Sequence, residues 1–275
     1  MSPTASTWGP ASTRAGAMSA AEAALERATG LVEPIGLAEV LETAELQTRV
    51  DRKYFVPAEL FGRFTARLAL RVLEIDGLRV FGYESVYFDT RWLTSYRNHV
   101  QRRRRRYKIR TRTYTDTGLC LFEVKLEGHR GSTVKERVPH PADQRDRITG
   151  AAADHLDRTL RAAYAHAAPT GLRKVLTTDY RRATFTLPAE GARLTCDVSL
   201  HCHDGAASVR DTGRHVLVES KSGAGGSSAD RLLRDLGVRP ISMSKYCVGV
   251  AALHPGVPSN PWRRMLRQHF EPGQG

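Results

Sequence analysis

Charged side chains recur at every second position in several short segments of the sequence. Lys108, Arg110 and Arg112 alternate in one segment, and Glu219 and Lys221 alternate in another. Residues two apart share one face of a β-strand, so each segment predicts a strand with one charged face. Guanidinium and ammonium groups bind phosphate oxygens, and carboxylates bind divalent cations. The pattern therefore favours the binding of a phosphate-rich polyanion together with a metal ion.

Further segments repeat this alternation, with apolar residues on the opposite face. An antiparallel sheet with its polar face in water would explain each strand taken singly. Basic residues recur on nearly every polar face, however, whereas a solvent-exposed face mixes charges of both signs. Strands that turn their charged faces toward one another make a barrel with a polar interior and helices outside. The polar positions of these further segments are Gln47, Arg49, Asp51, Lys53, Glu123, Lys125, Glu127, Arg182, Arg193 and Asp197.

The charge of the whole chain indicates the same class of partner. Its 275 residues contain 42 Lys and Arg against 29 Asp and Glu, which is a net charge of +13. A generally basic surface is the simpler alternative, but a charge of this size favours a polyanionic partner. Only seven of the basic residues are lysines, which we expect where a compact ammonium group is useful. These are Lys53, Lys108, Lys125, Lys135, Lys174, Lys221 and Lys245.

Hydrophobic periodicity and turn residues predict an α+β fold, an antiparallel β-barrel of about eight strands with flanking helices. We expect a flexible lead-in with a short helix over residues 1–40, the barrel domain over 41–254 and a tail over 255–275. The predicted helices cover residues 19–29, 58–74, 143–167 and 229–236. The predicted strands cover residues 45–56, 80–89, 107–115, 119–127, 132–138, 174–187, 192–201, 214–221 and 245–252.

The sequence predicts no membrane segment. Arginines interrupt the most apolar stretch, residues 60–73, and residues 1–20 lack the apolar core of a signal peptide. We therefore expect a cytoplasmic protein. The four cysteines have no paired C-x-x-C spacing, which predicts buried thiols instead of disulfides or a zinc ribbon. They are Cys120, Cys196, Cys202 and Cys247.

Nine segments, taken in order, resemble the VTC domain, a family of the triphosphate tunnel metalloenzyme or CYTH superfamily. The resemblance covers residues 45–252 and implies a tunnel-shaped antiparallel barrel. It also implies a polyphosphate polymerase, which transfers the γ-phosphate of ATP to a growing polyphosphate chain with Mn²⁺ or Mg²⁺. The segments are RKYFV (52–56), YFDT (87–90), KIRTRTY (108–114), FEVKLE (122–127), VKERV (134–138), YRRATF (180–185), RLTCDVSL (193–200), VLVESKS (216–222) and SMSKY (242–246).

The resemblance implies a role for most of the charged positions. Glu219 is the implied principal metal ligand, and Glu123 and Asp197 are secondary candidates that either bind metal, directly or through water, or orient an arginine. Phosphoryl transfer needs positioning and charge neutralisation, so no protein nucleophile is expected. The implied catalytic cations are Lys53, Arg110, Arg112, Lys125, Arg182 and Lys245, and the implied substrate-binding cations are Lys108, Lys135, Arg137, Arg193 and Lys221.

Two departures from the family pattern bear on the reaction. Relatives that hydrolyse triphosphate carry Glu-x-Glu-x-Lys on the first strand, where this sequence has Arg49, Asp51 and Lys53. A cation in place of a carboxylate favours the polymerase branch. Polymerases of the family often carry Lys-x-x-Lys at the last strand, where this sequence has Ser242 and Lys245, so one product-side cation is missing.

The alternatives are an inorganic or nucleoside triphosphatase of the same fold, and a non-catalytic module that binds polyphosphate or nucleic acid. Residues 102–106 are consecutive arginines, which form a nucleic-acid patch, a solvated loop or a funnel for polyphosphate. Few aromatic residues accompany them, so nucleic-acid binding is disfavoured. Residues 201–204 (His-Cys-His-Asp) suggest a transition-metal site, but their close spacing favours a surface turn. Residues 223–226 lack the Lys-Ser/Thr of a P-loop and predict a linker.

Overall fold

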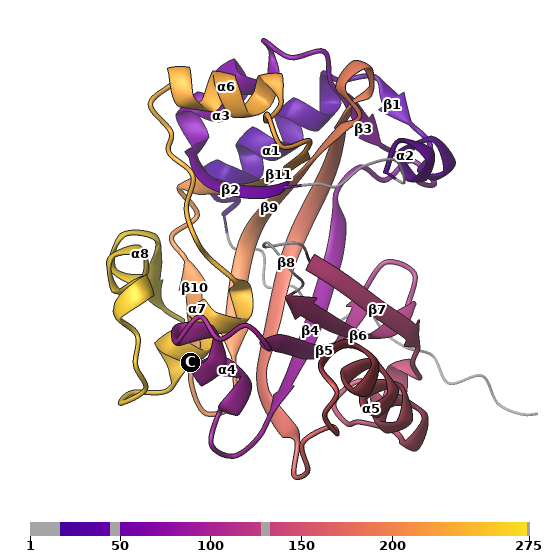
Figure 1. Cartoon of the computed structure of the whole chain (residues 1–275). Coiled ribbons are helices and arrows are strands. Elements are labelled where there is room, and N and C mark those ends of the chain that lie inside the picture. Colours follow the sequence, from indigo (N-terminus) through magenta and orange to yellow (C-terminus); the bar gives the residue numbers. More distant parts are fainter. Residues whose placement is uncertain (1–16, 45–49, 128–132, 274–275) are drawn as a thin grey trace, which may run out of the picture.

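One curved sheet forms the centre of the protein (Figure 1), whose computed structural model describes residues 17–44, 50–127 and 133–273. The main strands follow the spatial order β2-β11-β9-β8-β4-β5-β6-β7, and each neighbouring pair is antiparallel. They are β2 (Val50–Pro57), β4 (Phe81–Asp89), β5 (Tyr107–Tyr114), β6 (Cys120–Glu127), β7 (Thr133–Pro139), β8 (Arg173–Leu187), β9 (Ala192–His203) and β11 (His215–Ser222). The sheet confirms the predicted α+β fold with an antiparallel sheet and flanking helices.

Four shorter strands extend the sheet. β1 (Pro34–Ile35) runs parallel to β3 (Arg71–Leu73), which pairs with β8, and β10 (Ser208–Asp211) joins β9 to β12 (Phe270–Pro272). Within the described residues, β2 and β7 each pair with a single strand of the sheet. The predicted barrel is therefore open between β2 and β7.

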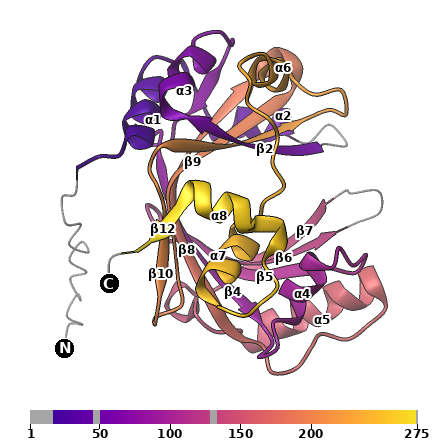
Figure 2. The same cartoon turned by 90° about the vertical axis from the view of Figure 1, so that its left-hand side faces the viewer.

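Helices cover the outer face of the sheet in separate groups. α1, α3 and α6 pack on β2, β9 and β11 through a core that contains Phe61, Phe64 and Phe185, whereas α5 packs on β5 and β6 through Phe122 and Leu156 (Figures 1 and 2). Most apolar residues of these strands point outward, as the sequence pattern predicts, whereas Phe55 on β2 and Leu217 on β11 point inward and belong to a separate apolar cluster. The helices are α1 (Ala20–Gly30), α2 (Leu37–Ala44), α3 (Ala58–Thr65), α4 (Thr94–Val100), α5 (Gly150–Tyr164), α6 (Ser228–Asp235), α7 (Lys245–Leu253) and α8 (Arg263–His269).

A third apolar cluster joins α4 and α7 to the other end of the sheet. The buried carboxylate of Asp89, at the end of β4, accepts hydrogen bonds from the backbone N–H groups of Ser95 and Tyr96 in α4 and from the hydroxyl of Tyr246 in α7. Tyr246 in turn stacks on Tyr87, with ring centroids 5.2 Å apart. These contacts hold the first turn of α7, which begins at Lys245, beside the inner face of the sheet.

A bulge in β9 changes which residues of that strand face inward. Ser199 has a left-handed backbone, with φ of 57°, and the pairing with β8 shifts register between Asp179 and Arg181. One extra residue in β9 reverses the alternation of side chains beyond it. Leu200 therefore belongs to the α7 cluster, whereas Val198 belongs to the α1 cluster. The sequence pattern, which assumed unbroken alternation, wrongly placed the two side chains on one face.

Several predicted elements differ from the observed ones, and α2 was not predicted. The predicted strand 245–252 is helix α7, because Ser244 caps its first turn by accepting a hydrogen bond from the N–H of Cys247. The predicted helix 58–74 ends at Thr65, and β3 follows within the same range. Residues 255–275, predicted as a tail with an amphipathic turn or two, contain the short helix α8, which agrees with that prediction, and the sheet strand β12, which was not predicted. Position 49 and the earlier part of the predicted strand 45–56 lie outside the described residues.

Two sequence predictions about the whole chain are tested by the described residues. None of the described helices combines the length and the apolar character that a bilayer-spanning segment needs. All four cysteines are free and buried, as their spacing predicts.

The predicted short helix over residues 19–29 is also present as α1, with a capping box between Ser19 and Glu22.

The close approach of α7 to the sheet predicts a specific cost for a larger residue at Gly249. A Cβ there would lie 2.7 Å from Cδ2 of Leu176 and 3.3 Å from Sγ of Cys202, both of which are fully buried. We expect Gly249→Ala to lower the free energy of unfolding by about 1–3 kcal/mol. Gly62 is the control, because it is an exposed helical position where an added Cβ meets no other atom. We expect Gly62→Ala to raise the free energy of unfolding by up to about 1 kcal/mol. Equal stabilisation of both variants in urea unfolding would contradict the expected crowding.

Candidate active site

Basic and acidic side chains from nearly every main strand gather on the inner face of the sheet, which we define as the face that carries Lys53, Arg110, Arg182 and Glu219. The curvature brings strands that are not neighbours within electrostatic reach. Lys125 on β6 interacts with Glu219 on β11, although four strands separate them in the sheet order. The cations meet three buried or nearly buried carboxylates, those of Glu219, Glu123 and Asp197.

The Glu219 carboxylate is surrounded by lysines from three strands. Its Oε1 accepts a hydrogen bond from Nζ of Lys221 at 2.8 Å and lies 3.9 Å from Nζ of Lys53, the residue directly opposite on β2. Burial opposes ionisation of Glu219, but Lys53, Lys221 and Lys125 outweigh it and hold the pKa of its carboxyl well below the usual range. Lys221 also reaches Asp51, whose Oδ2 is 3.0 Å away. Glu219 is therefore ionised, and a second carboxylate lies close to it.

The Glu123 carboxylate on β6 organises the arginines of β5. Oε2 accepts a hydrogen bond from Nε of Arg110 at 2.7 Å and lies 3.9 Å from Nε of Arg112, and Oε1 lies 3.3 Å from Nζ of Lys135. Glu123 is fully buried. Burial again opposes ionisation, but Arg110, Arg112 and Lys135 lower the pKa of the Glu123 carboxyl below its usual range. This carboxylate holds Arg110 and Lys135 by hydrogen bonds and lies within ion-pair distance of Arg112.

The Asp197 carboxylate on β9 pairs with cations from β8 and α7. Arg182 donates two hydrogen bonds to it, at 2.5 and 2.8 Å, and Lys245 donates another to Oδ2. Despite burial, Arg182 and Lys245 lower the pKa of the Asp197 carboxyl. Arg182 is thus held in a bidentate pair, the arrangement that positions a guanidinium most strictly.

Tyrosines support the same cations from the side, and the sequence analysis gave them no role. Arg182 lies over the rings of Tyr83 and Tyr180, at 5.2 Å from each centroid, and Nζ of Lys245 lies 4.3 Å from the Tyr180 centroid. Burial favours the neutral phenol, but three cations outweigh it and lower the pKa of Tyr180. The alternation of Tyr83, Ser85 and Tyr87 along β4 was a signal that could have placed these rings on the inner face.

The remaining predicted cations lie on the same face, at its ends and its open edge. Lys108 is directly opposite Lys125 in the β5–β6 pair, and burial lowers the pKa of both lysines, that of Lys125 to about 8. Arg193 is opposite Lys221. Arg137 is opposite Glu123 on the edge strand β7, and its side chain is exposed. The structure therefore brings together all the predicted cations on one face, whereas their catalytic and binding roles stay predictions.

The three predicted metal ligands are dispersed over the inner face. Among the described residues, Glu123, Asp197 and Glu219 do not form a cluster of three potential ligands, and each is paired with cations. The oxygens of Glu123 and Asp197 are all in contact with basic groups, which favours the orienting role for both. The described contacts of Glu219 use Oε1 alone. One carboxylate plus phosphate oxygens is a donor set that Mg²⁺ or Mn²⁺ accepts, so Glu219 fits the predicted metal.

Two other candidate features lie elsewhere. Arg102, Arg103, Arg104 and Arg105 are exposed in the loop between α4 and β5, which agrees with the solvated-loop interpretation, while Arg106 pairs with Glu127 at 2.7 Å. A pocket of about 310 Å³ opens on the outer face and is lined by none of the predicted inner-face residues.

The chain was compared with known families and structures. The VTC domain model matches residues 48–254. This chain belongs to the VTC domain family. The match confirms the resemblance drawn from the ordered segments, and it supports an enzyme that acts on polyphosphate or triphosphate. A search of curated proteins gave no significant match.

Several solved structures share the general shape of this VTC domain at low identity. An adenylate cyclase candidate from Vibrio parahaemolyticus has 15% identity and a TM-score of 0.42, with 72% of this chain and 95% of that chain covered. An adenylyl cyclase candidate from Hippeastrum, described with a dominant triphosphatase activity, has 13% identity and a TM-score of 0.47, with coverages of 76% and 98%.

The low pKa of Lys125 predicts a pH-dependent affinity. Because its pKa is about 8, Lys125 loses its proton as the pH rises from about 7 to about 9, and one cation facing the substrate disappears. We expect triphosphate to bind roughly tenfold more weakly at the higher pH, the equivalent of one charge-assisted contact. Lys125→Arg keeps its charge and should flatten this dependence in titration calorimetry. If Lys125→Arg lost triphosphate affinity just as steeply with rising pH, Lys125 would be excluded as the source of the pH dependence.

The buried position of Asp197 predicts a large effect on stability. Asp197→Asn leaves Arg182 and Lys245 without a counter-charge, and the free energy of unfolding should fall by about 3–5 kcal/mol. The control Glu271→Gln removes an exposed partner of Arg210, at 2.9 Å, and should cost at most about 1 kcal/mol. Added triphosphate should restore part of the lost stability of Asp197→Asn, because a bound anion neutralises the same cations. If urea unfolding showed a similarly small loss of unfolding free energy in both variants, Asp197 and its cations would not be effectively buried.

Proposed function

We propose that this VTC domain protein is a metal-dependent polyphosphate polymerase that transfers the γ-phosphate of ATP to a growing polyphosphate chain. The observation that carries the proposal is the convergence of cations from β2, β5, β6, β8, β11 and α7 on one face, where buried carboxylates hold Arg110, Arg182 and Lys245. Membership of the VTC domain family supports the substrate class. A linear phosphate chain is the ligand that matches an extended set of separate cations.

The residues of the inner face divide the work of phosphoryl transfer between them. Arg110, Arg112 and Arg182 bind non-bridging phosphate oxygens, and their carboxylate partners keep the guanidinium groups in place before substrate arrives, which reduces the reorganisation cost. Lys53 and Lys221 neutralise charge beside Glu219. A bound Mn²⁺ or Mg²⁺ would supply further charge neutralisation of the triphosphate there, with Glu219 as its protein ligand. No side chain acts as a nucleophile in this proposal.

The open edge of the sheet gives the polymer a route. Lys135 and Arg137 lie on the exposed edge strand β7, next to the gap between β7 and β2. A growing polyphosphate chain that leaves through this gap meets cations that stay partly in water, where pairing is weaker and reversible. The terminal phosphate of that chain is the proposed nucleophile.

Triphosphate hydrolysis is the second candidate, and Asp51 is the observation that favours it. Asp51 and Glu219 share Lys221 as a partner, so two carboxylates lie near the proposed metal position, although Asp51 is the single carboxylate that remains of the two in the Glu-x-Glu-x-Lys pattern. Water would then replace the polyphosphate terminus as the nucleophile.

The deciding experiment is incubation of the purified chain with ATP and Mn²⁺, followed by electrophoresis of the products. We expect long polyphosphate, and we expect Glu219→Gln to reduce its formation by about 100-fold, a loss typical of removing one group that stabilises charge in the transition state. The control Glu271→Gln should behave as the unmodified protein. Release of inorganic phosphate alone would establish the triphosphatase instead, and full metal-dependent turnover by Glu219→Gln would exclude Glu219 as the metal ligand.

A further inference from the structure

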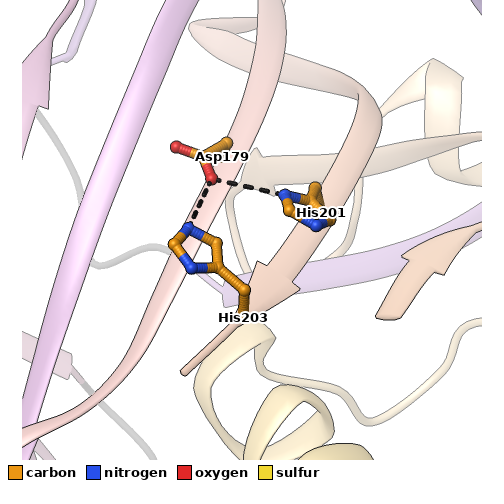
Figure 3. Close-up of side chains that lie close together, drawn as sticks. All are labelled: Asp179, His201 and His203. Atoms are coloured by element: carbon orange, nitrogen blue, oxygen red, sulfur yellow. Dashed lines mark ion pairs between the residues drawn. The ribbon is translucent and has the colours of Figure 1, made fainter. Parts of the chain in front are cut away.

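Three potential metal ligands lie together on the outer face of the sheet, opposite to the basic inner face. They are Asp179 on β8 and His201 and His203 on β9, and they point toward one another in Figure 3. Nδ1 of His201 and Nε2 of His203 lie 3.6 Å and 3.3 Å from Oδ2 of Asp179. In the part of the chain that the structure describes, this is the one group of three or more His, Cys, Asp or Glu ligand atoms within 4.8 Å of one another.

The bulge at Ser199 creates this cluster. With unbroken alternation, His201 and His203 would share the inner face with Asp197. The extra residue turns Cys202 inward, where it is fully buried, and turns both histidines outward. Asp179 is directly opposite His201 in the β8–β9 pair. The sequence analysis expected a surface turn at residues 201–204, but β9 continues through His203, and the turn begins at Asp204.

The distances between the three side chains suit a shared ion. With metal–ligand distances of about 2.0–2.1 Å, neighbouring ligand atoms of a tetrahedral site lie about 3.3–3.4 Å apart. The observed 3.3 and 3.6 Å are close to that separation and are long for direct hydrogen bonds. The two imidazole rings are nearly parallel, with an interplanar angle of 22° and centroids 5.1 Å apart, and each presents a ring nitrogen to the same oxygen of Asp179.

The surroundings leave room for further ligands. The three side chains are between 33% and 42% exposed, so water reaches them. His203 also lines the pocket of about 310 Å³, together with Arg145, Lys174 and Thr177. Thr177 is 2% exposed, and its hydroxyl has no hydrogen-bond partner among the described residues. A metal-bound water or anion in this pocket would give that hydroxyl a partner.

We propose that Asp179, His201 and His203 bind a divalent transition-metal ion such as Zn²⁺ and leave at least one coordination position open to the pocket. Two imidazoles and one carboxylate suit Zn²⁺ and its neighbours in the first transition row, whereas Mg²⁺ prefers oxygen ligands alone. The site is therefore chemically distinct from the proposed Mg²⁺ or Mn²⁺ position at Glu219. The pocket wall carries three basic side chains (Arg145, Arg147 and Lys174) and three acidic ones (Glu84, Asp143 and Asp146), so it favours neither an anion nor a cation as the additional ligand.

The test is calorimetric titration of the chelator-treated full-length chain with Zn²⁺ alone. We expect one bound ion, retained by Glu219→Gln, which removes the inner-face carboxylate. His203→Ala and Asp179→Asn should each weaken binding at least about tenfold, because even the loss of an outer-shell partner costs that much. The matched control His166→Ala removes a histidine two residues beyond the end of α5 and should bind as the unmodified chain does.

The opposite results would overturn the proposal. Absence of Zn²⁺ binding to the unmodified chain would do so, as would unchanged affinity in both His203→Ala and Asp179→Asn. Loss of binding in Glu219→Gln alone would move the ion to the inner face. Circular dichroism melting curves in the absence of metal should coincide with that of the unmodified chain for His203→Ala, Asp179→Asn and His166→Ala, whose altered side chains are partly exposed, and this check separates loss of a ligand from loss of fold.

Discussion

Buried charge neutralisation is the constraint on which the rest of this structure depends. A fold that turns its basic strand faces inward brings many positive charges together where water is partly excluded. This is unfavourable unless negatively charged side chains lie beside them. Glu123, Asp197 and Glu219 supply them, each shared between two or three cations. The same carboxylates keep the guanidinium and ammonium groups in position, so the arrangement that allows folding also prepares the surface for a phosphate chain.

Hydrogen bonds and a backbone irregularity away from the cation–carboxylate pairs decide where these side chains lie. Asp89 ties α4 and α7 to the end of β4, and so places Lys245 beside Asp197. Ile241 donates a backbone hydrogen bond to the carbonyl of Lys53 at 2.8 Å, which anchors the segment before α7 to β2. The bulge at Ser199 divides β9 into two parts with different side chains. Before the bulge, Asp197 faces inward and pairs with Arg182, and after it His201 and His203 face outward.

Much of the fold could be predicted from the sequence because period-two alternation is a local property. The strands from 80–89 to 214–221 were predicted close to their observed bounds, and the cations assigned to their polar faces do share the inner face. The misplacements arose where long-range contacts override local preference. Residues 245–252 are apolar and β-branched enough to suggest a strand, but α7 forms because its apolar residues are buried among α4, β8 and β10. Barrel closure likewise depends on pairing that no strand specifies by itself.

By itself the sequence determined the chemistry of the protein: an excess of arginine, a few lysines, carboxylates on the strand faces that carry cations, and the order of segments that marks a VTC domain. Only the tertiary structure decided which carboxylate pairs with which cation, since partners such as Arg182 and Lys245 are 63 residues apart and meet at Asp197 through two different elements. It also decided that Asp179 meets His201 and His203. One extra residue in a strand exchanges its faces, and the sequence pattern contains no signal of which residue that is.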